Sequence, residues 1–213
     1  MAGQGVANLV SMRRFLIGVA AVAVAALAAC DTGGQPDAAG SSAASTTAPT
    51  TSSSPAAEGC DEDWGTAEKS AEPSTSDAFY QVRAGKHDCF DRIVMDIDGQ
   101  ADVGYLVGYV PVVSADGSGN PFPVAGKAAL QVVLHAPAQG SDEAGGKIFA
   151  KAGDRLYPAS RLAGWRSLRE IRFAGSFEGY STVAVGVRGK LPFRVSTELD
   201  GQVRHVVIDI AHG

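Results

Sequence analysis

The chain has none of the short motifs that mark the common catalytic centres. The chain has 213 residues, and beyond its N-terminal segment it contains no Gly-x-Ser-x-Gly elbow, His-Glu-x-x-His pair, phosphate-binding loop or Ser-x-x-Lys pattern. Its four histidines, His87, His135, His205 and His212, are spread over the ends of different expected strands. A catalytic centre requires groups that converge on one point. We therefore expect a protein that is not an enzyme.

The sequence also has no convincing metal or cofactor motif. The nearest approach to a metal cluster is His87 with Asp88 and Asp91. Zinc requires three or four converging ligands, and a solvated turn explains these three residues equally well. We expect no metal and no cofactor.

No apolar run in the chain reaches the length of a membrane-spanning helix, which needs about 20 residues. The longest stretch without a polar side chain, Phe15 to Ala29, follows Arg13 and Arg14 and has 15 residues. This pattern predicts a signal peptide over residues 1–29. The letters "LAAC" that end at Cys30 resemble the bacterial lipoprotein box, which implies an acylated Cys30. The alternative is cleavage nearby that leaves Cys30 as a thiol.

Residues 31–58 contain no Lys, no Arg and no apolar side chain larger than Ala. Of these 28 residues, 24 are Ala, Ser, Thr, Gly or Pro, a composition that cannot bury enough surface to fold. We expect residues 30–76 to be a lipidated cysteine followed by a disordered tether. The protein would then be lipid-anchored to the cell membrane and face away from the cytoplasm, with the bilayer as a partner through Cys30.

Positive charge is scarce. Without residues 1–29 the chain has 16 basic residues (18 less Arg13 and Arg14) against 23 acidic ones, a formal charge of −7. Nucleic-acid binding depends on neutralising phosphates with Lys and Arg, so we expect no nucleic-acid partner. The same balance disfavours an anionic membrane surface as a direct ligand of the domain.

Cysteine is also scarce, with three residues in the chain. Once Cys30 is assigned to lipid, Cys60 and Cys89 form an even pair in an exported chain, which favours a disulfide. A metal site is the alternative, but it lacks a second pair of ligands at suitable spacing.

Residues 77–213 alternate apolar and polar side chains in short segments separated by turn residues such as Asp98-Gly99 and Asp200-Gly201. We expect an all-β domain, a β-sandwich or partly open barrel of about eight short, mostly antiparallel strands. The exception is the long loop over residues 141–165, which could contain a helical turn. The expected strands cover residues 79–84, 92–98, 105–113, 128–135, 167–176, 180–187, 193–198 and 204–210.

Acidic residues interrupt two of the apolar strands. Side chains two apart in a strand share a face, so Ile93, Met95 and Ile97 should enter the core, as should Val206, Ile208 and Ile210. Asp96, Asp98 and Asp209 should then be solvated on the outer face. Asp96 and Asp98 could suit a glycosidase pair by distance alone, but nothing in the sequence buries them, so we expect surface carboxylates.

Three long stretches together resemble one family. "HDCFDRIVMDIDG" (87–99), "DGSGNPFPVAGKAALQVVL" (116–134) and "FEGYSTVAVGVRGKLPFRVSTELDGQVRHVVIDIAH" (177–212) are similar to the AMIN-like domain of actinobacterial exported lipoproteins. This resemblance implies a non-catalytic module that binds peptidoglycan or another wall polymer. The alternatives are a scaffold that recruits another envelope protein and, less favoured, a cell-wall hydrolase.

Candidate ligand-binding side chains lie in the two long loops. Exposed aromatic rings stack on sugars, and an arginine cluster can meet anionic polymers. The alternative for each aromatic ring is that it folds back onto an end of the sandwich. The alternative for the arginines on the expected strand is that they are solvated charges on a sheet edge, which prevent association between sheets. The candidates are Trp165, Tyr157, Phe122, Arg161 and Arg166, with Arg169 and Arg172 in the same cluster.

Overall fold

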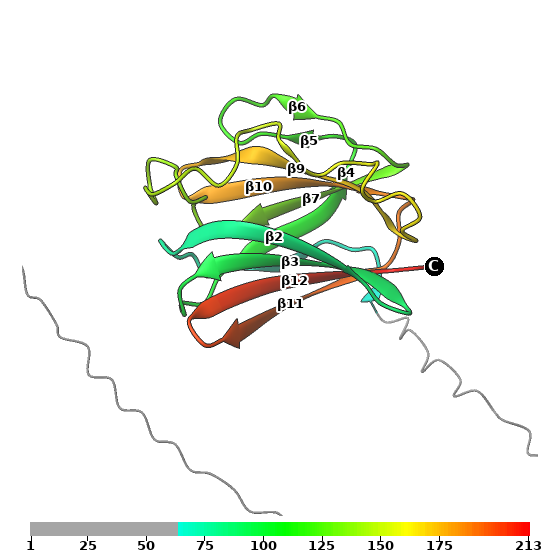
Figure 1. The fold of residues 1–213 in the computed structure, drawn as a ribbon, viewed down its shortest axis with the longest axis horizontal. Coiled ribbons are helices and arrows are strands. Elements are labelled where there is room, and N and C mark those ends of the chain that lie inside the picture. Colours follow the sequence, from blue (N-terminus) through cyan, green and yellow to red (C-terminus); the bar gives the residue numbers. More distant parts are fainter. Residues whose placement is uncertain (1–63) are drawn as a thin grey trace, which may run out of the picture. The chain divides into compact units, whose positions relative to one another are not determined.

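The computed structural model describes residues 64–213. This part of the chain is all-β, with twelve strands in antiparallel sheets, almost no helix and no closed barrel. Figure 1 shows two main layers of strands facing each other. The expected β-sandwich is therefore confirmed. The expected signal peptide, Cys30, Cys60 and most of the tether lie outside the described residues.

The larger sheet has six strands, in the order β1-β4-β7-β10-β9-β8. Each neighbouring pair is antiparallel, for example Val183 of β10 opposite Val132 of β7. The strands are β1 (Lys69–Ala71), β4 (Tyr105–Val110), β7 (Ala128–Leu134), β10 (Tyr180–Val187), β9 (Leu168–Phe177) and β8 (Arg155–Tyr157).

The smaller sheet has four strands, in the order β11-β12-β3-β2, so β11 and β2 are its edges. A separate two-stranded ribbon, β5 with β6, lies over the other face of the six-stranded sheet (Figure 1). The strands are β11 (Phe193–Asp200), β12 (Val203–Ala211), β3 (Phe90–Asp98), β2 (Ala78–Lys86), β5 (Val113–Ser114) and β6 (Pro121–Phe122).

The core lies between the two sheets and follows the period-two pattern of the sequence. Ile93, Met95 and Ile97 of β3 are fully buried and belong to the same apolar cluster as Leu130 of β7 and Val185 of β10. Burying one such side chain stabilises a fold by about 1.5–3 kcal/mol. Val206, Ile208 and Ile210 of β12 are buried as well. The inward-facing residues expected from the sequence are therefore confirmed.

The acidic residues of β3 and β12 lie on the expected outer face, but two of them are not solvated. The Asp96 and Asp209 side chains are only 3% and 2% exposed, whereas Asp98 is exposed. The solvated state predicted for Asp96 and Asp209 is therefore wrong. Side chains from neighbouring strands cover the two carboxylates.

Asp96 and Asp209 each accept several charge-assisted hydrogen bonds. Arg83 of β2 binds Asp96 through two nitrogens, both at 2.7 Å, and His205 Nδ1 lies 2.7 Å from the same carboxylate. Arg92 binds Asp209 in the same two-pronged way, and Arg194 Nε adds a contact at 2.9 Å. Such fork-shaped pairs combine strength with fixed geometry, and the hydrogen bond to Asp209 raises the pKa of Arg92. They hold the four strands together across their outer face.

All eight expected strands are present, with ends shifted by a few residues. The sequence interpretation missed β1, β5, β6 and β8, each of which has two or three residues. Residues 141–165 form no helix, but they contain two single turns closed by a hydrogen bond four residues apart, Gly145 N to Ser141 O and Leu162 N to Pro158 O, together with the short strand β8. Within residues 64–213, no helix combines the length and apolar character needed to cross a bilayer.

Candidate functional site

One end of the sandwich gathers basic side chains from four connections. It comprises the end of β2, the segment 158–167 before β9, the turn after β10 and the residue before β7. Backbone hydrogen bonds join these connections, since Arg188 N donates to Ser167 O and Lys127 N donates to Val187 O. We call it the basic end. Its basic residues are Lys86, Lys127, Arg161, Arg166, Arg169, Arg188 and Lys190, all exposed except the half-buried Arg169.

The opposite end of the sandwich, which we call the acidic end, carries the reverse charge. Its main cation, Arg204, is largely buried, donates to the carbonyls of Gln100 and Ala101 and pairs with Asp102 at 3.0 Å. Lys147 is exposed in the loop 139–149. The acidic residues here are Glu72, Asp77, Asp98, Asp102, Asp142, Glu143, Glu178 and Asp200.

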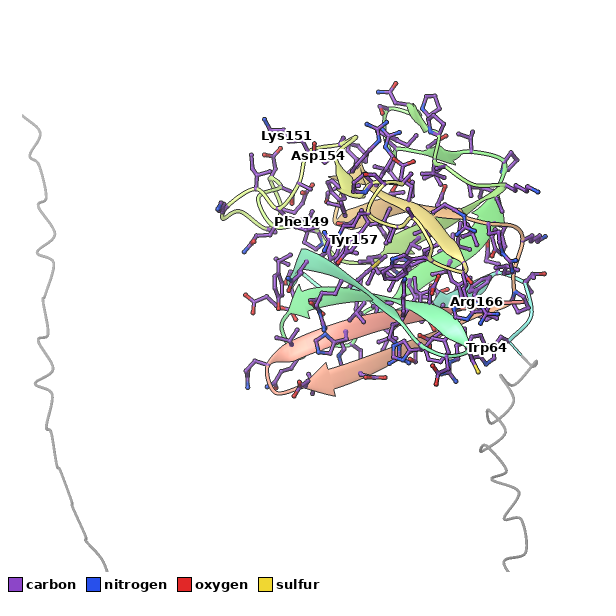
Figure 2. The ribbon with its side chains drawn as sticks, turned by 45° about the vertical axis from the view of Figure 1, so that its right-hand side comes forward. Trp64, Phe149, Lys151, Asp154, Tyr157 and Arg166 are labelled. Atoms are coloured by element: carbon purple, nitrogen blue, oxygen red, sulfur yellow. The ribbon has the colours of Figure 1, made fainter. Side chains whose placement is uncertain are left out.

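Trp165 and Arg166 both lie at the basic end. The sequence predicted that these two residues lie together. Figure 2 shows Arg166 on the same side of the domain as Trp64, away from Lys151 and Asp154. The Trp165 ring is half-buried, and Lys86 Nζ of β2 lies 5.4 Å from its centre. Arg169 Nη1 donates to the Trp165 carbonyl at 2.9 Å. Trp165 thus joins a loop of one sheet to the edge strand of the other.

Tyr157 has a structural position beside this surface. Its side chain is buried, and its hydroxyl accepts the N–H of Ala84 at 3.1 Å, which links β8 to β2 across one side of the sandwich. The Arg161 guanidinium lies over the ring, 4.2 Å from its centre. Tyr157 therefore offers a support for Arg161 and no open ring face for a ligand.

Phe122 and Arg172 lie apart from the other candidates. Phe122 is half-buried in the β5–β6 ribbon, against an apolar cluster around Val113. The Arg172 guanidinium lies 5.6 Å from its ring centre and donates to the carbonyls of Pro123 and Gly153. Nε of Arg172 has no hydrogen-bond partner. This pair secures the ribbon to the six-stranded sheet and is not part of the basic end.

A buried carboxylate holds the basic end together. Asp91 points inward, is fully buried, and accepts the backbone N–H groups of Ser167 and Leu168 at 2.7 and 2.9 Å. Its other oxygen lies 3.0 Å from Nε2 of His212. The solvated turn considered for His87, Asp88 and Asp91 is therefore wrong for Asp91. Because Asp91 belongs to one sheet and Ser167 to the loop before β9, this contact fixes the loop that carries Trp165.

Ser167, His212 and Asp91 include the residue types of a hydrolase triad but not its arrangement. The Ser167 hydroxyl is buried and donates to the carbonyl of Ala211 at 2.7 Å, and no hydrogen bond links it to His212. Nδ1 of His212 lies 3.1 Å from the Asp88 carbonyl. A triad requires the hydroxyl to bond the imidazole. These three residues clamp the end of β12 in place.

The basic end also contains a groove of about 460 Å³ beside the ends of β4 and β7. Lys127 and Lys190 both line it, together with apolar side chains that include Pro111, the exposed Val112 and Pro123. Specific ligand sites commonly have volumes of about 300–1,000 Å³ and combine an apolar lining with a few placed polar groups. We call this the lysine groove.

Tyr109 also lines the lysine groove. Its hydroxyl donates to the Leu191 carbonyl at 2.8 Å and accepts the Leu191 N–H at 3.0 Å, which fixes the segment after Lys190. Burial raises the pKa of Tyr109, so the phenol stays protonated at neutral pH. The lysines supply the positive charge of the groove.

A second hollow, of about 350 Å³, lies at the acidic end. Glu143, Glu178 and the exposed Tyr180 line it, with the hydroxyl residues Ser74 and Thr75. Hydrogen bonds from its own backbone N–H and from Ser141 lower the pKa of Glu143. This hollow is therefore negatively charged at neutral pH, in contrast to the lysine groove. In residues 64–213, no three His, Cys, Asp or Glu residues are grouped to hold a metal ion.

Sequence reasoning missed Asp91 as an anchor and Lys86, Lys127 and Lys190 as parts of the site. Lys127 and Lys190 each follow a glycine at a strand boundary, a weak sign of exposed turn residues. Their closeness depends on β10 pairing with β7, which places Val187 opposite Ala128. These strands are not consecutive in the chain, so no local pattern specifies the pairing.

Comparison with known proteins points to a family. The family model described as the AMIN-like domain matches residues 77–212, which covers the main strands of both sheets and all seven residues of the basic end. No curated protein and no solved structure matches this chain.

Proposed function

Because this chain belongs to the AMIN-like domain family, we propose that it is a membrane-tethered recognition module of the cell envelope, without catalytic activity. Its ligand is an anionic polymer of the cell wall, such as the carboxylate-bearing strands of peptidoglycan. The basic end binds this polymer. The observation that carries the proposal is the gathering of seven basic side chains at one end of a domain in which charges nearly balance, with 16 basic and 17 acidic residues over residues 64–213.

The contacts of the basic end suit a polymer rather than a small buried ligand. Its cations come from separate connections, and most of them reach solvent, so an extended anion can meet several at once. Exposed charges act within about 8–10 Å at physiological salt, so the distant acidic end cancels little of their attraction. Lys127 and Lys190 would hold an anionic group in the lysine groove, while Pro111 and Val112 pack against apolar parts of the ligand.

The membrane anchor is the part of the proposal that rests on the sequence. We propose that Cys30 is acylated after removal of residues 1–29, and that residues 31–63 connect it to the domain. The described chain begins at Trp64, whose ring contacts Phe90 at 5.6 Å, near the basic end. The anchor would therefore connect to that end. Replacing Cys30 with Ser should move the protein from the membrane fraction to the soluble fraction and abolish labelling by a fatty-acid probe.

A disulfide between Cys60 and Cys89 is a further part of the proposal. Cys60 precedes Trp64 by four residues, and Cys89 adjoins Phe90 in the turn between β2 and β3. The contact between Trp64 and Phe90 brings the two neighbourhoods together. Peptide mapping without reductant should give one linked pair containing both cysteines. Two separate thiol-bearing peptides would contradict it.

The binding test is co-sedimentation of the full chain, in detergent, with purified cell wall. We expect sedimentation that weakens as NaCl is raised, because exposed charge attractions are screened. K127E with K190E should abolish it, and Trp165→Ala should weaken it by loosening the loop that carries Arg166. The control variant D142K with E178K changes two charges at the acidic end and should leave binding intact.

Two outcomes would contradict the proposal. Sedimentation that K127E with K190E leaves unchanged would exclude the basic end as the binding surface. Absence of sedimentation at low salt would exclude wall binding and favour a protein partner. A parallel turbidity assay should show that the protein does not clear the wall suspension, whereas clearing would indicate a hydrolase.

A further inference from the structure

The edge strand β11 has an open side. Phe193 N donates to Gly65 O, away from β12, whereas Ala211 N of β12 donates to Pro192 O. Backbone groups alternate in direction along an antiparallel strand, so the N–H and C=O groups of Val195, Thr197 and Leu199 also point away from β12. No described strand lies on that side of β11.

The other edge of the same sheet is covered instead. Phe79 N of β2 donates to Pro137 O, Gln139 N donates to Phe79 O, and Ala84 N donates to the Tyr157 hydroxyl. The edge strands of the six-stranded sheet, β1 and β8, have only three residues each. β11 has eight residues and contains neither Lys nor Pro. Charged side chains, Lys above all, protect an open edge, but the three charges of β11, Arg194, Glu198 and Asp200, are of both signs, so a second copy can meet them with opposite charges.

We propose that β11 pairs antiparallel with β11 of a second copy of this chain, with Thr197 facing Thr197 across a two-fold axis. This register sets Val195 opposite Leu199 of the second copy, and Leu199 opposite its Val195. All three positions carry the outward backbone groups, so each pair can exchange both hydrogen bonds. The two sheets then form one continuous eight-stranded sheet, and the interface is the same patch on both copies.

The side chains of β11 are self-complementary in this register. On the outer face, Arg194 lies opposite Asp200 of the second copy, and the symmetric contact repeats the pair. Both residues are exposed; the Arg194 guanidinium bonds Asp209 through Nε and lies 4.4 Å from the centre of the Trp64 ring, so the pairing requires its terminal nitrogens to turn toward Asp200 of the second copy. On the other face, Leu199, which is 48% exposed in the single chain, meets Val195 of the second copy. Opposite charges and apolar pairs across strands both stabilise a sheet.

Neighbouring registers are less favourable. Moving the axis to Ser196 places Leu199 opposite Phe193, whose N–H is already bonded to Gly65. Moving it to Glu198 places that carboxylate opposite itself, and like charges directly opposite destabilise a pair. The register centred on Thr197 keeps the outward backbone groups paired. It also places Arg194 opposite Asp200 and leaves the bond between Gly65 and Phe193 in place.

An interface made by one strand is small, so dimer formation should depend on holding both copies in the same membrane. Tethering both copies in one membrane raises their concentration relative to each other. The pairing does not depend on what the basic end binds, because β11 lies outside that surface. Loss of wall binding and loss of self-association can therefore be measured separately.

The test is cysteine cross-linking of the full chain in membranes of the cells that produce it. Thr197→Cys should give a dimer of this chain on mild oxidation, seen on non-reducing gels and lost with reductant. Ser196→Cys, one position away, and Gln81→Cys, on the exposed face of the covered edge β2, serve as matched controls and should give several-fold less. The unsubstituted chain, run in parallel, reports any dimer formed through its native cysteines.

A second pair of variants separates pairing from folding. T197P removes an N–H that β12 does not use, and proline is tolerated at such edge positions; D200R places a cation opposite Arg194. Both should keep the far-ultraviolet circular dichroism of the unsubstituted chain. Both should also reduce dimer capture by a lysine-reactive cross-linker several-fold.

Equal dimer yields from Thr197→Cys and Gln81→Cys, or none from either, would overturn the proposal. A higher yield from Ser196→Cys than from Thr197→Cys would overturn its register. A cross-linked product of Thr197→Cys that contains a different protein, or a loop closed with the N-terminal segment of the same chain, would also overturn it.

Discussion

The two ends of the sandwich are built from the same strands, yet they hold their charges in opposite ways. At the basic end, the buried carboxylate of Asp91 binds backbone N–H groups while the cations reach solvent. At the acidic end, the largely buried guanidinium of Arg204 binds backbone carbonyls while most of the carboxylates reach solvent. Each end therefore has a buried ion of its minority sign, whereas most of its exposed ions carry the majority sign.

This contrast shows why the net charge of a domain is a poor guide to what it can bind. The formal charge of −7 for the chain without residues 1–29 argued against anionic partners, but six of its acidic residues precede Trp64. The described domain has 16 basic and 17 acidic residues, and this near balance is divided between two surfaces of opposite sign. A buried minority ion satisfies the backbone groups of the loops around it, as buried polar groups require. The exposed ions are then free to act on a partner.

The largest expected effect concerns the buried ion of the basic end. Asp91→Ala leaves the N–H groups of Ser167 and Leu168 without their acceptor and should lower the free energy of unfolding by about 3–5 kcal/mol. Asp98→Ala, at the acidic end, removes an exposed carboxylate and should change it by less than about 0.5 kcal/mol. Urea unfolding followed by tryptophan fluorescence measures both. Similar losses in the two variants would contradict the role given to Asp91.

The matching ion of the acidic end should matter less. Arg204→Ala frees the carbonyls of Gln100 and Ala101, but these residues are exposed and water can replace the guanidinium. We expect a loss of about 1 kcal/mol, near the net value of an ordinary hydrogen bond, in the same urea experiment. If Arg204→Ala lowered the free energy of unfolding as much as Asp91→Ala, the two buried ions would stabilise their ends equally.

An exchange of charges between the two ends tests whether wall binding depends on the charge of the basic end or on the net charge of the whole chain. K190E combined with E143K lowers the charge of the lysine groove by two units, raises that of the acidic end by two units and leaves the net charge unchanged. Each charge near a charged surface contributes about 1 kcal/mol, so wall affinity should fall roughly tenfold or more. E143K alone, as control, should not reduce it. Unchanged affinity in the double variant would indicate that only total charge matters.

The smallest expected effect is the response of the basic end to alkali. Burial raises the pKa of Tyr109 above its ordinary value of 10.0, so the folded chain holds this proton more tightly than the unfolded chain. Its contribution to stability is fully present below pH 10.0 and is lost as the pH rises through the folded pKa. Tyr109→Phe should therefore flatten the fall in stability measured by denaturation above pH 10. The remaining slope would include Tyr80, whose pKa burial also raises.

Alternation along single strands was enough to predict the core. Ile93, Met95 and Ile97 are buried because each strand must turn its apolar side to the other sheet, and this pattern is local. The burial of Asp96 was missed because it depends on Arg83 of β2 and His205 of β12. The sequence does not show which side chains of separate strands will stand next to each other.

For the same reason, only part of the candidate site could be predicted from the sequence. Trp165 and Arg166 are neighbours in one loop, so the sequence placed them together. Lys127 and Lys190 meet only because β10 pairs with β7, a contact between strands that are far apart in the chain. The ribbon of β5 and β6 was missed for another reason, since two residues are too few to show a period of two.

The route of the chain has a practical consequence. Gly65 bonds to Phe193 at the start of β11, and Arg188 bonds to the carbonyl of Gly213 at 3.2 Å, so the described chain enters and leaves the domain from one side; Figure 1 places the C-terminus beside the first residues of β3. A fluorescent protein or affinity handle fused after Gly213 would crowd Lys190 and its neighbours. A label inserted at the exposed turn Asp200-Gly201 would leave that side clear, although it would adjoin β11.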